Sequence, residues 1–112
     1  MGPLVERGDI YRNKADPNVA GRTTEAVWRR NVPCLLEPIS ADASRIAFAL
    51  ESSHVVFVPA WLHGIRKEDE IRISGHINLD GDRLPNRYIV TGVRSFQRFG
   101  ERHIECFSKL RR

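Results

Sequence analysis

The sequence predicts a mainly β protein: a small closed barrel of about six antiparallel strands, with one short helix or ordered loop inserted near the middle. The first observation is a series of short apolar or alternating runs, separated by turn signals, in a chain of 112 residues. The second is that barrel closure would protect the edges of these strands. The third is a composition of 41% hydrophobic and 29% charged residues, which is typical of a globular domain. We expect one domain over residues 1–112, with an N-terminal arm at 1–7 and a basic C-terminal tail at 109–112.

The first two strands flank a polar stretch. Residues 9–12 form a short strand candidate, and residues 13–25 read as a polar loop with turn residues at Asp16-Pro17-Asn18. The second strand begins near Ala26 and runs past residue 36. Prolines within it cannot donate to a sheet ladder, so residues 33 and 38 indicate an edge position or a bulge.

A helical pattern follows. Ser40 or Asp42 is a suitable helix cap, and apolar residues at 43, 46, 49 and 50 have helical spacing. This predicts a helix of about three turns at most, or an ordered loop.

Four more strands are predicted after it, at residues 54–58, 71–73, 87–93 and 102–107, with turns at 61–64, 79–82 and 99–101. Alternation assigns one face of each strand to the interior. The candidate core residues are Val32, Cys34, Leu36, Val56, Val58, Ile71, Ile73, Val90, Ile104 and Cys106.

Cys34 could be a nucleophile, a metal ligand or a packed thiol. Its position on the apolar face with Val32 and Leu36 favours a packed thiol. No catalytic or nucleotide-binding motif is present, and the four histidines are scattered singly. His103 and Cys106 lie three apart on a strand and therefore point to opposite faces, which argues against a shared metal site. We expect no enzymatic activity, no cofactor and no metal.

The net charge of +4 is concentrated near the C-terminus, since residues 93–112 hold six basic and two acidic residues, a difference of four. This end could meet phosphate or an acidic protein, or it could be a solvated edge strand with a charged tail. The acidic run at 68–70 lies beside Arg66 and Lys67, so we expect a self-neutralised, solvated turn.

The stretch RSFQRFGERH interleaves aromatic and basic residues, with Phe96 and Phe99 among three arginines. Stacking on exposed aromatics with phosphate neutralisation is the OB-fold mode of binding single strands. An OB-like single-stranded nucleic-acid-binding module is therefore an alternative function. The other interpretation is that the phenylalanines pack inward and the arginines face water.

The order of segments resembles a known family. A GDIYRN strand precedes a DPNVAGRTTEAVW loop, a VPCLLEPIS strand, a helical segment and SHVVFVP. A GIRKEDEIRI turn and strand and a closing RYIVTGVRSF complete the pattern. This order is similar to the head–tail joining proteins of tailed bacteriophages and gene transfer agents, also called head-closure or stopper proteins. The resemblance covers about residues 8–108. Leu35 departs from it, because many relatives carry a polar or charged residue after the Cys.

The resemblance implies a non-enzymatic virion structural protein. Such proteins form a ring, six- or twelve-fold, in the neck of the particle, between the portal or adaptor and the tail terminator. The ring extends the DNA channel and contacts packaged double-stranded DNA non-specifically. The family also tends to carry a loop that projects toward the channel, for which residues 13–24 and 40–53 are the candidates.

The resemblance also implies synthesis in the bacterial cytoplasm, and we expect no membrane contact, because no apolar run approaches the ~20 residues of a span. Eight cations are candidate contacts to DNA in the channel or to partner proteins: Arg12, Lys14, Arg22, Arg45, Arg66, Lys67, Arg98 and Arg102.

Overall fold

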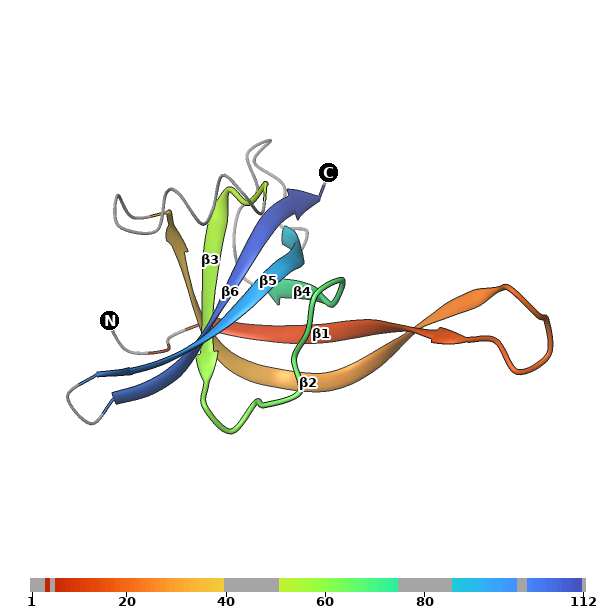
Figure 1. The fold of residues 1–112 in the computed structure, drawn as a ribbon, viewed down its shortest axis with the longest axis horizontal. Coiled ribbons are helices and arrows are strands. Elements are labelled where there is room, and N and C mark those ends of the chain that lie inside the picture. Colours follow the sequence, from red (N-terminus) through yellow and green to blue (C-terminus); the bar gives the residue numbers. More distant parts are fainter. Residues whose placement is uncertain (1–3, 5, 40–50, 75–85, 99–100, 112) are drawn as a thin grey trace.

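The chain folds into a closed six-stranded β-barrel in a computed structural model (Figure 1). The structure describes residue 4 and residues 6–39, 51–74, 86–98 and 101–111. Within these ranges there are strands and no helix, so the predicted fold class is confirmed. The strands are β1 (Glu6–Ala15), β2 (Thr23–Pro38), β3 (His54–Pro59), β4 (Glu70–Ser74), β5 (Asn86–Arg98) and β6 (Glu101–Arg111).

The strand order around the barrel is β1-β2-β3-β6-β5-β4, and every neighbouring pair is antiparallel. Two three-stranded meanders, β1-β2-β3 and β4-β5-β6, thus close on each other through the β3–β6 and β1–β4 pairs. β6 lies between β3 and β5, so the interpretation of the C-terminal segment as an edge strand is wrong. Residues 109–111, which were expected in a basic C-terminal tail, belong to this strand.

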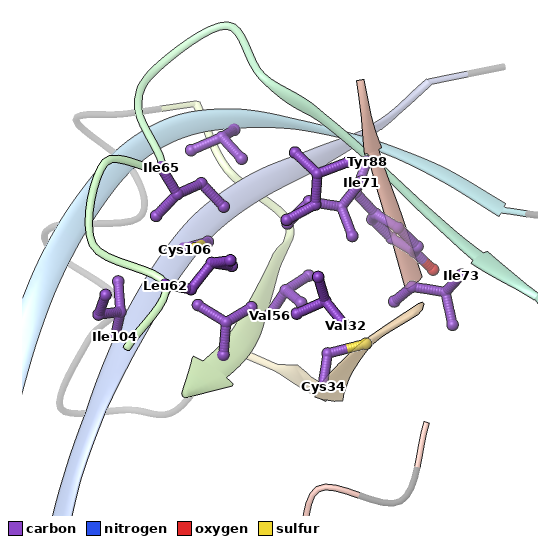
Figure 2. Packing of buried hydrophobic residues seen from close by; sticks show 13 residues of the cluster. Val32, Cys34, Val56, Leu62, Ile65, Ile71, Ile73, Tyr88, Ile104 and Cys106 are labelled. Carbon is purple, nitrogen blue, oxygen red and sulfur yellow. The ribbon is translucent and has the colours of Figure 1, made fainter. Parts of the chain in front are cut away.

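The barrel interior is filled by side chains from all six strands (Figure 2). Of the ten candidate core residues, nine are buried, and Leu36 packs against them from a half-buried position. Four further residues complete this core: Ile10, Leu62, Ile65 and Tyr88. Period-two alternation explains the inward position of Val32 and Cys34 on β2 and of Ile71 and Ile73 on β4.

Residues 60–69, here called the cap, connect β3 to β4 across one end of the barrel. Leu62 and Ile65 point from the cap into the core. The backbone of the cap is fixed at both ends, because Leu62 N–H donates to the Pro59 carbonyl at 3.0 Å and Glu68 N–H donates to the Val90 carbonyl at 2.8 Å. The cap is therefore an ordered segment over the core, held by hydrogen bonds to β3 and β5.

Some expectations fall outside the described residues. The helix or ordered loop expected at 40–53 lies mostly there, as do the turn at 79–82 and most of the turn at 99–101. Of the N-terminal arm expected at 1–7, Glu6 and Arg7 belong to β1 and pair with β2. Among the described residues there is no helix long and apolar enough to cross a membrane.

Candidate functional site

The β1–β2 hairpin continues well beyond the barrel wall (Figure 1). β1 pairs with β4 only as far as Tyr11, and β2 pairs with β3 only from Leu35 onward. Residues 12–30 therefore leave the barrel as a two-stranded ribbon, here called the arm, which forms one end of a molecule 48 Å long. The polar loop predicted at 13–25 is thus a longer hairpin, with its turn at residues 16–22.

Two irregularities in β2 turn the arm out of the barrel. β2 has one residue more than β1 between the pairs Gly8↔Val32 and Ile10↔Arg29. It again has one residue more between the pairs Ile10↔Arg29 and Tyr11↔Val27. An extra residue bends its strand and increases the local twist. Asn31, with a φ of 53°, lies within the first irregularity. These bulges lie just before Pro33, as the prolines in this strand indicated.

The inner face of the arm is attached to the cap through a buried ion pair. Arg12 binds Asp69 with two hydrogen bonds, Nε to Oδ1 at 2.9 Å and Nη2 to Oδ2 at 2.7 Å. Its Nη2 also donates to the Gly64 carbonyl at 2.8 Å, and Arg66 N–H donates to Asp69 Oδ2 at 3.0 Å. The hydrogen bonds with Asp69 raise the pKa of Arg12 above its ordinary value. Since the Asp69 side chain is 1% exposed, this is a bidentate pair in a largely desolvated position.

Trp28 adds a packed contact to the same junction. The guanidinium of Arg12 lies 4.0 Å from the centroid of the Trp28 ring, and that of Arg29 lies 4.4 Å from it. Gly64 has a φ of +99°, and a Cβ at this position would lie 3.3 Å from the Trp28 ring. Gly64 is therefore needed both for its backbone conformation and for the close approach of the cap to the arm.

A second ion cluster holds the outer face of the arm. The buried Glu70 accepts hydrogen bonds from Arg72 Nε at 2.6 Å and from Arg111 Nη1 at 3.0 Å. Arg72 also binds Glu25 of the arm and lies 3.7 Å from the centroid of the Tyr11 ring. Asp69 and Glu70 were expected in a solvated, self-neutralised turn. That interpretation is wrong, since both are buried and pair with arginines distant in sequence.

Beyond these two braces the arm is exposed. Residues 13–15 and 17–25 are solvent-exposed, and Val19 near the tip is an exposed apolar side chain. A two-stranded ribbon without a core is marginal in water, so the braces at its root are what fix its direction. An arm held in this way is suited to contact something other than its own barrel.

The candidate contact cations that the structure describes are spread over the arm, the cap and β6. Arg12 is bound to Asp69 and Gly64 and packs on Trp28, which gives it a structural role, and its assignment as a contact residue stays a prediction. Five others are exposed at separate places, with Lys14 and Arg22 on the arm, Arg66 and Lys67 on the cap, and Arg102 on β6. Arg45 and the side chain of Arg98 lie outside the described residues.

Two further cations, Arg29 and Arg30, are exposed on the arm and were not among the candidates. They occur in an AVWRRNVP run that reads as the start of a strand, where charged residues usually face solvent without a function. Only the position of this run on a ribbon outside the barrel distinguishes them from other surface arginines.

A second hairpin, β5–β6, extends on the side opposite to the arm (Figure 1). Arg94 on β5 donates from Nε to Glu105 Oε2 on β6 at 2.8 Å, and His103 Nε2 lies 3.6 Å from the other oxygen of Glu105. His103 is buried against Phe57, with ring centroids 5.1 Å apart. Arg94 is therefore engaged within the sheet. The side chains of Phe96 and Phe99 lie outside what the structure describes.

The cysteines have the properties of core residues. Cys34 and Cys106 are free thiols with no exposed surface. Burial raises the pKa of Cys34 to about 12 and raises that of Cys106 further above its ordinary value. Such thiols stay protonated at neutral pH and are poor nucleophiles and poor metal ligands. In the described part of the chain, no three His, Cys, Asp or Glu residues are grouped so that they could hold a metal ion.

Comparison of the chain with protein-family models, with curated proteins and with solved structures found no match.

Proposed function

We propose that this chain is a structural subunit of a ring in the neck of a bacteriophage or of a gene transfer agent. In this role it joins the portal or adaptor on the head side to the tail terminator on the tail side and extends the channel for double-stranded DNA. Its work is mechanical and non-enzymatic. The order of sequence segments that resembles head–tail joining proteins supports this proposal, as does the small closed barrel.

The observation that carries the proposal is the braced arm. Arg12 with Asp69 holds its inner face, and Arg72 with Glu25 and Glu70 holds its outer face, while the residues beyond are exposed. A closed ring requires head-to-tail contacts between two different surfaces of one subunit. The arm and the β5–β6 hairpin extend on opposite sides of the barrel (Figure 1), so they would supply two such surfaces in the proposed ring.

The charge of the chain is compatible with a DNA channel. Lys14 and Arg22 are the exposed cations toward the tip of the arm, and Asp16 lies 3.8 Å from Arg22. Attraction to phosphate is independent of sequence, so a few exposed cations suffice for non-specific contact. A modest net charge of +4 would allow DNA to pass without strong retention.

The proposal is tested by deleting the gene in the organism that encodes the chain and imaging the particles by cryo-electron microscopy. We expect filled heads and free tails that do not join, and a collar of copies at the joint when the gene is restored. A chain with a shortened arm would be present but would fail to restore joining. Normally tailed particles in the deletion strain would exclude this function.

A further inference from the structure

One edge of the arm has no neighbouring strand. β2 pairs with β1 on one side from residue 23 onward, and its pairing with β3 on the other side begins only at Leu35. Within the described residues, the second side of Thr23–Arg30 therefore faces no strand. Eight extended residues at ~3.3 Å each give an edge about 26 Å long. From Thr23 to Val27 every second residue directs its N–H and C=O outward, and the two bulges between Val27 and Val32 interrupt this alternation toward the barrel.

The protein's own side chains bind backbone groups near the root of this strand. Asp9 Oδ1 accepts a hydrogen bond from Asn31 N–H at 2.9 Å, and Arg29 Nη1 donates to the Trp28 carbonyl at 2.8 Å. Asp9 belongs to β1, the strand that already pairs with β2, and Arg29 belongs to β2 itself, so both hydrogen bonds lie within the β1–β2 hairpin. An unpaired edge is a template for strand addition unless it is blocked, and no proline interrupts Thr23–Arg30.

The charge along this edge is positive. Arg22, Arg29 and Arg30 are exposed, and Glu25 is the one acidic residue between them, so residues 22–30 carry three minus one, or +2. Glu25 is already bound by Arg72, and Arg30 Nη1 lies 4.0 Å from Asp9 Oδ2. All three arginines remain exposed although each has a contact within the chain, since Arg22 lies 3.8 Å from Asp16 and Arg29 donates to the Trp28 carbonyl.

We propose that the open edge of β2, Thr23–Arg30, binds an extended acidic segment of another protein by strand addition. The edge offers alternating donors and acceptors, and a peptide strand supplies both partners in the same spacing. A DNA backbone supplies acceptors, which would leave the outward carbonyls without donors. Acidic side chains on the added strand would pair with Arg29 and Arg30. This inference concerns one edge and does not rest on a place in a phage neck.

The test uses an eight-residue peptide of alternating valine and glutamate as the probe, titrated to about 1 mM against the isotope-labelled full chain. We expect saturable NMR shifts in the backbone amides of residues 23–30, and we expect binding to weaken as salt is raised. The same peptide with all its backbone nitrogens methylated keeps its charge but has no ladder donors. It should not bind, and equal binding would overturn strand addition.

Two matched variants test the role of charge. Arg29→Gln/Arg30→Gln and Lys14→Gln/Lys67→Gln remove the same charge, but only the first pair lies on the open edge. We expect the first to weaken peptide binding about fivefold, as two exposed ion pairs allow, and the second to leave it within twofold. Equal effects would mean that only net charge matters and would contradict the proposal.

Other occupants give distinct results. An eight-nucleotide single-stranded DNA that shifts the same amides more strongly than the peptide would assign the edge to nucleic acid. Shifts that grow with protein concentration, together with a larger sedimentation coefficient, would assign it to a second copy of the chain. No response to the peptide at about 1 mM would also overturn the proposal.

Discussion

Arg12 and Asp69 illustrate how one residue pair determines the position of a much larger element. They are 57 positions apart in sequence, and their bidentate contact joins the first strand to the cap. In the sequence Asp69 lies between two other carboxylates and close to two cations, so the sequence predicts that these neighbouring cations neutralise its charge. The arginine that binds Asp69 is brought to it by closure of the barrel. Composition and spacing in the sequence therefore do not identify this arginine.

Replacing Arg12 should be strongly destabilising. Arg12→Leu leaves Asp69 buried without its cation, and breaking a buried pair in this way costs about 3–5 kcal/mol. Urea unfolding followed by tryptophan fluorescence would measure the loss. Arg22→Leu is the matched control, because Arg22 is 66% exposed and lies 3.8 Å from Asp16. Its effect should stay below about 0.5 kcal/mol. Similar losses in both variants would mean that the Arg12 pair does not hold the arm.

The buried thiol of Cys34 should make stability depend on alkaline pH. Burial raises its pKa from 9.0 to about 12, so the unfolded chain loses this proton first as pH rises. The stabilisation is complete below pH 9.0 and is lost between about pH 9 and pH 12. Cys34 contributes up to about 1.4 kcal/mol per pH unit within this window. The free energy of unfolding of Cys34→Ala should therefore fall less steeply with pH than that of the unchanged chain. Equal slopes would show that Cys34 ionises in the folded protein as it does in the unfolded one.

At the scale of elements, the sequence predicts well those strands that bury an apolar face. Val32 and Cys34 alternate with other residues on β2, and the strand predicted at residues 54–58 differs from β3, His54–Pro59, by one residue at its end. The ends of the hairpins were missed for a physical reason. Residues 13–15 and 23–25 bury nothing, so they carry no apolar alternation, and a polar ribbon cannot be told from a loop by periodicity.

Because the arm buries little, shortening it should hardly change stability. Lys14 and Thr24 are a cross-strand pair, so replacing residues 15–23 by Asn-Gly closes the hairpin with a two-residue turn. Arg12, Glu25 and Trp28 are kept, so both braces remain. We expect the free energy of unfolding to change by less than about 1 kcal/mol. A large loss in urea unfolding would show that the tip supports the barrel and is not a free contact element.

At the scale of the whole molecule, the distribution of charge separates the proposed function from its alternative. The C-terminal excess of +4 suggested a nucleic-acid surface on β5 and β6. In the folded chain Arg94 is bound to Glu105 and Arg111 is bound to Glu70, which reduces the number of cations open to phosphate on these strands. The exposed cations that remain in the described residues are divided between the arm, the cap and the barrel strands, where they include Arg87, Arg102 and Lys109.

Scattered cations of this kind should give weak, salt-sensitive binding to short single strands. Single-strand binding proteins combine a continuous basic groove with stacking aromatics, and each stacked base contributes about 1–3 kcal/mol. We therefore expect the purified chain to bind an oligonucleotide of about ten nucleotides with a Kd above about 10 μM at physiological salt, measured by fluorescence anisotropy. Phe96→Ala should leave that value within about twofold, with Arg102→Gln as a control for charge. Sub-micromolar binding that is lost in Phe96→Ala would instead favour the single-stranded nucleic-acid-binding module, because loss of affinity on removing one aromatic ring requires a base stacked on it.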